Sequence, residues 1–213
     1  MRVWRRPALP PEAPGTGPRT MGELWRCFVA VPVPARLRAD LGAAAARWRA
    51  RESSPNLRWT DPHDWHVTLA FLGATEASVV PDLVLALRPV ADGTAAFRLR
   101  TGGVGAFPRP GVAQAIWYGI SDPDFLLADL AGRVQTAVLP PGASARFRPH
   151  LTLARSRVRG GEPLGPWMAA LDPPPGTLAV NALTLFRSHL GRGPARYEVL
   201  ARLPLRGAGS AHG

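Results

Sequence analysis

The sequence contains no lysine, and all 26 of its basic residues are arginine. A phosphate-binding loop that ends in Gly-Lys-Ser or Gly-Lys-Thr is therefore excluded. A lysine nucleophile that carries a nucleotidyl group or forms a Schiff base is excluded for the same reason. We accordingly do not expect ATP-driven ligation.

Cysteine is almost absent, because Cys27 is the only one. A disulfide framework and a cysteine-based zinc site both need more than one cysteine. Cys27 lies within the apolar run 25–31 and is interpreted as part of the core. The sequence also lacks His-Glu-x-x-His, a carboxylate-rich calcium loop and a Gly-x-Ser-x-Gly elbow. We therefore expect no metal site and no cofactor.

Long hydrophobic runs are missing as well. No apolar segment approaches the roughly 20 residues that span a bilayer, and residues 1–18 carry arginine and proline without an apolar signal core. The expectation is a cytoplasmic protein with no membrane partner. A chain of 213 residues with 46% hydrophobic residues can bury one sizeable core.

The formal net charge of +11 suggests an anionic partner. Arginine suits bidentate contacts to phosphate. A composition rich in Arg, Ala, Pro and Gly is also what base bias in coding DNA produces, however. The charge by itself is therefore weak support for nucleic-acid binding.

Apolar periodicity divides the chain into two ends and one central domain. Residues 1–23 are rich in proline and are predicted to form a flexible arm, and 206–213 a flexible tail. Residues 24–205 are predicted to form one bilobal domain in which strands and helices alternate. Strands are predicted at 25–31, 57–59, 65–72, 97–101, 112–120, 147–155, 178–186 and 197–203, and helices at 34–51, 79–87, after 121–124 and near Trp167. The helix after 121–124 is predicted to have Phe125, Leu126, Leu130 and Val134 on its apolar face.

A four-residue pattern occurs twice. His-Val-Thr-Leu stands at 66–69 and His-Leu-Thr-Leu at 150–153. Since side chains alternate across a strand, the His and Thr of each copy share one face and the apolar residues share the other. Two halves related by a pseudo-twofold axis would bring both polar faces to one central cleft.

Such a cleft suits hydrolysis of a cyclic phosphodiester, which needs a base for water and an acid for the departing ribose oxygen. Imidazole does both near neutral pH, which makes His66 and His150 the candidate pair. Thr68 and Thr152 can donate hydrogen bonds to phosphate oxygens, and Arg155 can stabilise negative charge in the transition state. Because Arg155 is an odd number of residues from His150, an ideal strand would direct it to the opposite face, and it would have to reach back from the strand end.

The structural alternative for one such motif is a half-buried polar pair without chemistry, which is the usual role of a single His-x-Thr on a strand. Two copies in matching contexts favour catalysis instead. The other three histidines are interpreted as structural or surface residues: His63 in a turn, His189 at a strand end and His212 in the tail.

Several segments together resemble a known family. They are Arg-Cys-Phe-Val-Ala-Val-Pro at 26–32, Trp-His-Val-Thr-Leu-Ala-Phe-Leu-Gly at 65–73, Gly-Ala-Phe-Pro at 105–108, Pro-His-Leu-Thr-Leu-Ala-Arg at 149–155 and Ala-Arg-Tyr-Glu-Val-Leu at 195–200. They resemble the two-histidine phosphoesterases, specifically the bacterial and archaeal RNA 2′,3′-cyclic phosphodiesterases, also called 2′-5′ RNA ligases. The resemblance covers about residues 25–205.

The resemblance implies a bilobal α+β fold in which two antiparallel sheets face a central cleft and helices lie outside. It also implies hydrolysis of an RNA 2′,3′-cyclic phosphate to a 2′-phosphomonoester without metal or ATP. His66 would match the proton donor to the 3′ oxygen and His150 the proton acceptor from water. Thr68, Thr152 and Arg155 would hold the phosphate.

Two other functions fit the same residues. The substrate could be a small cyclic nucleotide or a cyclic phosphate on a metabolite, or the protein could be a non-catalytic module that binds RNA ends. Assays on cyclic-ended RNA and on cyclic mononucleotides distinguish the small-molecule substrate from RNA. Binding of an RNA end without conversion would indicate the non-catalytic module. The expected partners are RNA ends with a cyclic phosphate or small cyclic nucleotides, and the expected state is a monomer.

Overall fold

The computed structural model describes residues 23–51, 56–144, 146–189 and 196–208. Most of the predicted arm 1–23 and most of the predicted tail 206–213 lie outside the described residues, as does His212. Of the three described tail residues, Arg206 pairs with Ala95 of the domain in an isolated bridge. The predicted boundaries of the arm, domain and tail remain predictions.

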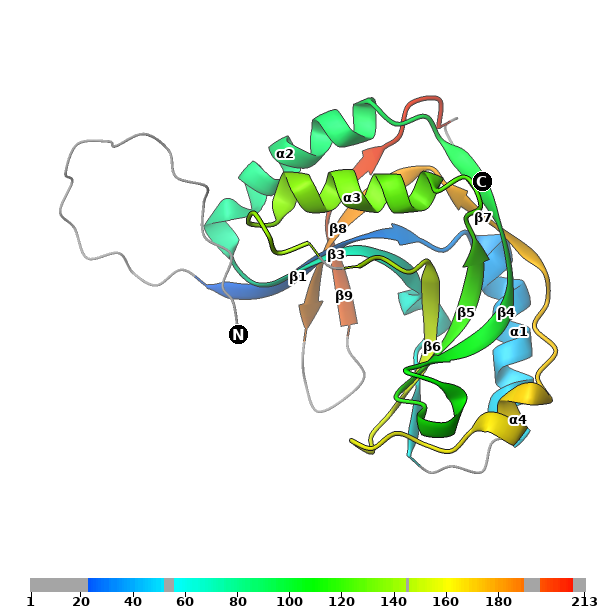
Figure 1. Cartoon of the computed structure of the whole chain (residues 1–213). Coiled ribbons are helices and arrows are strands. Elements are labelled where there is room, and N and C mark those ends of the chain that lie inside the picture. The colour runs from blue at the N-terminus through cyan, green and yellow to red at the C-terminus, as the bar shows by residue number, and fades with distance from the viewer. Residues whose placement is uncertain (1–22, 52–55, 145, 190–195, 209–213) are drawn as a thin grey trace, which may run out of the picture.

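The described residues form strands and helices in alternation (Figure 1). The strands are β1 (Leu24–Pro32), β2 (Leu57–Trp59), β3 (His66–Glu76), β4 (Phe97–Phe107), β5 (Ala115–Ser121), β6 (His150–Ser156), β7 (Gly176–Val180), β8 (Ala182–His189) and β9 (Arg196–Pro204). The α-helices are α1 (Ala35–Arg51), α2 (Val80–Asp92), α3 (Leu126–Val138) and α4 (Gly165–Ala169). Short 3₁₀ helices cover Pro62–Asp64, Ala77–Val79 and Pro110–Val112.

Two antiparallel sheets carry the fold. The first has the order β3-β1-β8-β9 and the second the order β2-β6-β5-β4-β7. The helices α2 and α3 lie side by side, α2 against β8 and β9 and α3 against β3 (Figure 1). The predicted α+β class with two antiparallel sheets is confirmed.

The two halves of the chain repeat one connectivity. A strand, a helix, a histidine-bearing strand and a further helix occur in this order as β1-α1-β3-α2, with β2 between α1 and β3, and again as β5-α3-β6-α4. A strand that comes after each unit joins the other half's sheet: β4 pairs with β5, and β8 pairs with β1. This exchange of strands supports the pseudo-duplication that the paired motifs suggested.

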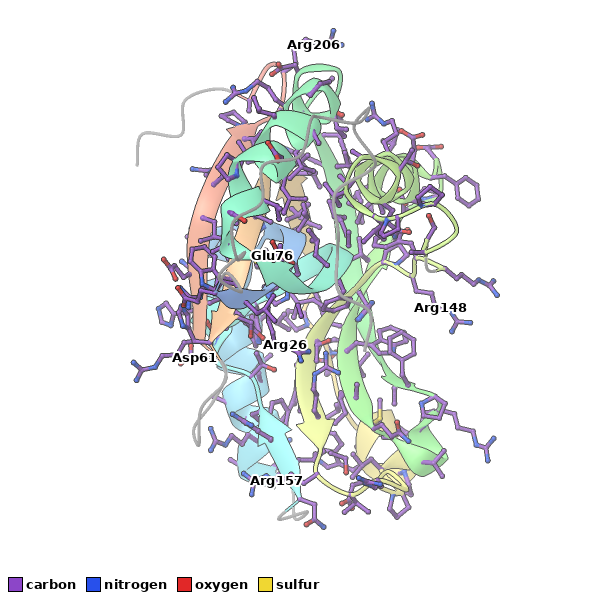
Figure 2. The ribbon with its side chains drawn as sticks, turned by 90° about the vertical axis from the view of Figure 1, so that its left-hand side faces the viewer. Arg26, Asp61, Glu76, Arg148, Arg157 and Arg206 are labelled. Atoms are coloured by element: carbon purple, nitrogen blue, oxygen red, sulfur yellow. The ribbon has the colours of Figure 1, made fainter. Side chains whose placement is uncertain are left out.

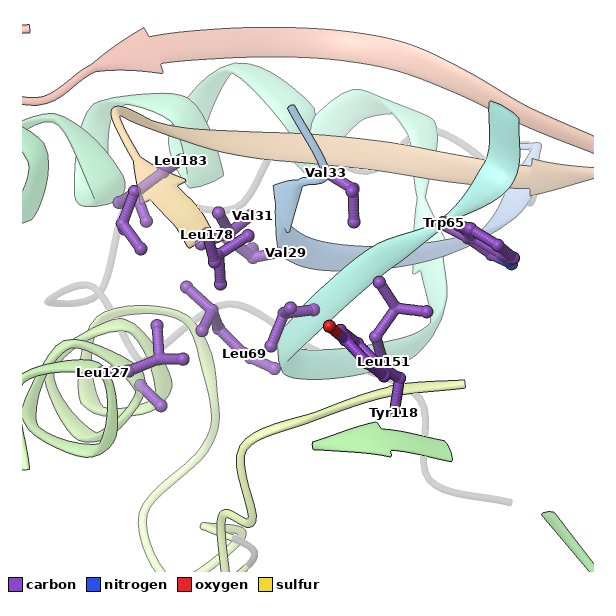
Figure 3. Packing of buried hydrophobic residues seen from close by; sticks show 14 of the residues in the cluster. Val29, Val31, Val33, Trp65, Leu69, Tyr118, Leu127, Leu151, Leu178 and Leu183 are labelled. Atoms are coloured by element: carbon purple, nitrogen blue, oxygen red, sulfur yellow. The ribbon is translucent and has the colours of Figure 1, made fainter. Parts of the chain in front are cut away.

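A single core joins the two sheets. Val29 and Leu69 of the first sheet, Tyr118 and Leu151 of the second and Leu127 of α3 are all almost completely buried in one cluster (Figure 3). The apolar faces of the histidine strands are part of this cluster. The core therefore fixes the position of β3 relative to β6.

Two sequence predictions were wrong in this region. The single strand predicted at 178–186 is two strands, β7 and β8, which belong to different sheets and meet at Asn181. Both pieces are buried, so the apolar run contains no signal of the crossing between sheets. In α3, Phe125 and Leu126 were assigned to the apolar face, but they are exposed, and Leu127 takes the inward position.

The start of two predicted strands also differs. Residues 110–112 form a 3₁₀ helix, so β5 begins only at Ala115. Residues 147–149 are not part of β6, which begins at His150. Pro110 is the first residue of the 3₁₀ helix, a position that proline favours, and Pro149, which cannot donate to the ladder, stands directly before β6.

Candidate active site

The two histidine strands meet at one cleft of about 500 Å³. β3 and β6 lie against each other, and each contributes its His and Thr to the lining. All five candidate residues of the sequence analysis line this cleft: His66, Thr68, His150, Thr152 and Arg155.

The predicted division of faces holds in both strands. Val67, Leu69, Leu151 and Leu153 are at most 2% exposed, whereas the His and Thr between them are only partly buried. The polar face of each strand therefore borders the cleft while the opposite face packs in the core.

A β-bulge explains how Arg155 reaches the cleft. On the neighbouring strand β5, Trp117 pairs with Thr152 and the next residue, Ile116, pairs with Ala154, which leaves Leu153 as an extra residue. Leu153 and Ala154 are consequently both buried, and Arg155 returns to the face of His150. The expectation that Arg155 reaches back from the strand end was based on ideal alternation, which the bulge interrupts.

The first strand has the same irregularity at the same place. Thr68 pairs with Ala30 and Ala70 with Val29, so Leu69 is the extra residue. The side chain that returns to the cleft five residues after His66 is Phe71. Bulges thus occur in both copies of the motif, and they place Phe71 and Arg155 at equivalent positions.

A buried hydrogen bond holds the bulge in β3. The side-chain amide of Gln135, on α3, donates to the Leu69 carbonyl at 3.0 Å. We expect Gln135→Leu to lower the free energy of unfolding by about 1–3 kcal/mol, because a buried carbonyl would lose its partner. Urea denaturation measures the change.

The neighbouring Thr136 offers a control for this prediction. Its hydroxyl is exposed and donates to the Gly132 carbonyl of its own helix. Thr136→Ala should change the free energy of unfolding by less than about 0.5 kcal/mol. Equal stabilities of the two variants would show that the Leu69 carbonyl does not depend on Gln135.

Each of the two candidate catalytic histidines is oriented by the backbone carbonyl of the residue two positions before it. Nδ1–H of His66 donates to the Asp64 carbonyl at 2.6 Å, and Nδ1–H of His150 donates to the Arg148 carbonyl at 2.7 Å. A carbonyl only accepts, so Nδ1 carries the proton in both rings. Nε2 is then the nitrogen that remains for proton transfer.

Aromatic rings pack around His66. Its ring centroid lies 4.7 Å from that of Phe28, 5.1 Å from that of Tyr197 and 6.1 Å from that of Phe186. Among the rings that the structure describes, His150 has one such neighbour, Phe107, at 4.9 Å and nearly perpendicular to it. The rings restrict both imidazoles, and they place His66 in the more apolar surroundings.

These surroundings lower the pKa of both histidines. The pKa of His66 falls to about 4, chiefly because burial disfavours the charged ring, and the charges of Arg155 and His150 act in the same direction. Burial also lowers the pKa of His150, with a further contribution from Arg155. Both rings are therefore neutral at pH 7 before an anion binds.

Several cleft residues were not predicted as site residues from the sequence. They are Arg26, Phe28, Thr60, Asp64, Phe71, Phe107 and Tyr197. Figure 2 shows Arg26 between the two sheets. An aromatic residue on a strand carries no sequence signal that separates a cleft wall from a core position. Arg26 is two residues before Phe28 on β1, so ordinary alternation places both side chains on the cleft face.

The other described histidines lie outside the cleft. His63 is 84% exposed at its side chain and bonds to Asp61, and His189 bonds to Glu198. Both agree with the structural roles assigned to them. Among the described residues, no group of three or more His, Cys, Asp and Glu side chains is placed to hold a metal ion.

A larger hollow of about 790 Å³ lies between α2 and α3, on a different part of the surface. It contains the ion pair of Arg133 with Asp129 but no histidine. The side chains that can transfer protons are gathered in the smaller cleft.

None of the described helices has the length and apolar character needed to cross a membrane.

Two half-chains of matching connectivity that each direct a His-x-Thr into one cleft define the class of the two-histidine phosphoesterases. The chain belongs to the 2′-5′ RNA ligase superfamily, since residues 32–192 match that family. The resemblance drawn from the sequence is therefore confirmed.

Proteins named RNA 2′,3′-cyclic phosphodiesterase are among its relatives. The one from Thermus thermophilus is 32% identical over 195 residues, which cover 85% of this chain and 91% of that protein. The one from Escherichia coli is 30% identical over 192 residues, covering 87% and 99%. The one from Geobacillus stearothermophilus is 32% identical over 187 residues, but the match covers 85% of this chain and only 57% of that longer protein.

Solved structures agree with this membership. A structure from Thermus thermophilus matches with a TM-score of 0.68 and 29% identity over 85% of this chain and 98% of that one. E. coli LigT in complex with 3′-AMP matches with a TM-score of 0.66 and 30% identity over 86% and 99%.

Proposed function

We propose that this protein hydrolyses the 2′,3′-cyclic phosphodiester at an RNA end to a 2′-phosphomonoester. The observation that carries the proposal is that His66 and His150 line one cleft, each with Nδ1 bonded to the backbone. Both Nε2 atoms are thereby left for one phosphate. The names of the relatives support the same substrate class.

In the proposed mechanism, Nε2 of His150 accepts a proton from water as the water oxygen attacks phosphorus. The bond between phosphorus and the 3′ oxygen breaks, and Nε2–H of His66 donates its proton to that oxygen. The hydroxyls of Thr68 and Thr152 donate to the non-bridging oxygens. The Arg155 guanidinium stabilises the charge that develops there.

The donor must be protonated when the substrate is bound, although burial keeps His66 neutral in the free protein. The bound phosphate brings a negative charge next to the ring, which favours the imidazolium and raises the pKa of His66. Substrate binding therefore favours the protonated form of His66 that the mechanism needs. The roles of the two histidines follow the family pattern.

Phosphorus NMR of a cyclic-ended oligonucleotide tests the reaction. We expect the cyclic phosphate signal to be replaced by that of a 2′-phosphomonoester, at the same rate with and without a chelator. A 3′-phosphate product would contradict the proposed bond cleavage. Loss of turnover in chelator would contradict the metal-independent mechanism.

The lowered pKa values predict the pH dependence. The active state needs one protonated and one neutral imidazole, and both rings of the free protein titrate below their usual 6.5. We therefore expect kcat/KM to peak on the acidic side of pH 6.5 and to fall as the pH rises, because the donor loses its proton. The kcat profile should lie at higher pH, since bound phosphate raises both pKa values. A kcat/KM that increases from pH 6.5 to 8 would contradict this account.

A cyclic mononucleotide is a second candidate substrate, because a cleft of about 500 Å³ has room for one nucleotide and the related LigT was solved with 3′-AMP. Comparing kcat/KM on a cyclic-ended oligonucleotide and on the corresponding mononucleotide decides between them. The net charge of +11 favours the RNA substrate.

We further propose that the protein acts in the cytoplasm as a monomer.

A further inference from the structure

A smaller pocket of about 250 Å³ adjoins the catalytic cleft. Asp64, His66 and Tyr197 line both spaces, so His66 stands at the border between them. None of the described residues that line this pocket comes from the second sheet. The pocket is therefore separate from His150 and takes no part in the proton transfer described above.

One row of paired residues runs across the first sheet from the cleft to this pocket. Thr68 of β3 pairs with Ala30 of β1. Ala30 pairs in turn with Thr184 of β8, and Thr184 with Arg202 of β9. Paired residues share a face of the sheet, and neighbouring strands are about 4.8 Å apart, which places Thr184 about 10 Å and Arg202 about 14 Å from Thr68. The row begins at a phosphate-binding hydroxyl and ends at a guanidinium.

Thr184 has a buried hydroxyl without a partner. The residue is 1% exposed, and its Oγ1 has no hydrogen-bond partner among the described residues. Leu183 and Leu185 on either side of it belong to the core, so the Thr184 side chain points to the opposite face, where it lines the pocket. Buried hydroxyls are normally hydrogen-bonded. A ligand with acceptor oxygens in this pocket would supply the missing partner.

Two arginines give the pocket a positive charge. They are Arg38, close to the start of α1, and Arg202. Neither guanidinium has an ion pair with a described residue. The first turn of α1 contains no acidic residue, so the positive end of the helix dipole adds to the two charges. Asp64, at the border with the cleft, is the one carboxylate among the described lining residues, so positive charge prevails and favours an anion.

We propose that this pocket is a second phosphate subsite, which binds a backbone phosphate of the RNA upstream of the cyclic end; the proposal rests on the proposed function. The guanidinium groups of Arg38 and Arg202 contact the phosphate oxygens, and the Thr184 hydroxyl donates to one of them. A cyclic mononucleotide has no upstream phosphate. The second phosphate subsite therefore makes the protein prefer an RNA end to a mononucleotide.

A trinucleotide with a 2′,3′-cyclic end and two linking phosphates tests the proposal. Each linking phosphate in turn is replaced by a methylphosphonate, which keeps the shape of the linkage and removes its charge. We expect one of the two replacements to lower the wild-type kcat/KM by about 5- to 20-fold. The double variant Arg38→Gln/Arg202→Gln should show the same loss on the unmodified trinucleotide, and the neutral linkage should then cause no further loss. Adenosine 2′,3′-cyclic phosphate should be turned over equally by both proteins.

The double variant Arg36→Gln/Arg157→Gln is the matched control. Arg36 is exposed on the same helix as Arg38, Arg157 is exposed beyond β6, and neither lines the cleft or the pocket. This control removes the same charge and should keep the full sensitivity to the neutral linkage. A wild type that is insensitive to both linkages would overturn the proposal. So would a double variant of Arg38 and Arg202 that remains as sensitive as the wild type.

Thr184→Val separates a binding role of the hydroxyl from a structural one. Valine keeps the shape of the side chain and removes only the hydroxyl. Because this hydroxyl has no described partner in the protein, the free energy of unfolding should not fall. We expect a lower kcat/KM on the trinucleotide and an unchanged value on adenosine 2′,3′-cyclic phosphate. An equal loss on both substrates would contradict the role of Thr184 in the second phosphate subsite.

A binding measurement distinguishes failure of this proposal from failure of the proposed function. Calorimetry with a trinucleotide that ends in a 2′-phosphate needs no turnover. Weaker binding to the double variant of Arg38 and Arg202, seen only when the linkage is charged, would support the second phosphate subsite even if the cyclic compounds were not hydrolysed. Wild-type protein that binds this trinucleotide no more tightly than adenosine 2′-phosphate would overturn it.

Discussion

Replacement of either His66 or His150 by alanine is expected to lower kcat on a cyclic-ended oligonucleotide by about 10²- to 10⁴-fold, the usual contribution of one general acid or base. Each ring is held at Nδ1 by a backbone carbonyl and presents Nε2 as its remaining nitrogen. No other described histidine lines the cleft to replace it. Single-turnover kinetics on the two variants measures the loss at the chemical step.

Two controls make this result specific. His63→Ala removes an exposed imidazole outside the cleft and should retain wild-type turnover. A substrate whose leaving group needs no protonation should rescue His66→Ala and not His150→Ala, because only the donor becomes dispensable. Rescue of the opposite variant would exchange the two roles, and full activity in both alanine variants would remove the mechanism.

Arg155→Ala is expected to lower kcat by about 10²- to 10³-fold, since it removes the cation that faces the developing negative charge. A second effect distinguishes this role from a structural one. Arg155 helps to lower the pKa of both histidines, so its removal should raise both pKa values and shift the kcat/KM profile to higher pH. Rate and pH profile are measured together on the same preparation.

Arg157→Ala provides the control for the loss of one positive charge. Arg157 is exposed, lies beyond the end of β6 and is not part of the cleft. Its replacement should lower kcat by less than about two-fold and leave the pH profile in place. A loss of activity at Arg155 without a shift of the profile would limit that residue to holding the phosphate.

The central part of the site could be predicted because it depends on local geometry. Residues two apart on a strand share a face, so His66 with Thr68 and His150 with Thr152 had to lie together. The repetition of the motif then suggested that the two faces meet. Both inferences use short-range patterns that a sequence displays directly.

The positions of Arg155 and Phe71 could not be predicted in this way. They depend on bulges at Leu153 and Leu69, where the histidine strand has one residue more than the strand beside it. In β3, the side-chain amide of Gln135 also donates to the carbonyl of this extra residue. Nothing in a Leu-Ala pair reveals that both side chains point to the core. The crossing between sheets at Asn181 was missed for a similar reason, because buried strands on either side read as one apolar run.

The exchange of β4 and β8 between the sheets has a mechanical consequence. Each half of the molecule is completed by a segment of the other, so the chain crosses repeatedly between the two sheets, and one buried core joins them. Moving the lobes apart would expose this apolar core to water, which opposes a hinge motion. The gap across which a proton enters and a proton leaves is therefore set largely when the chain folds.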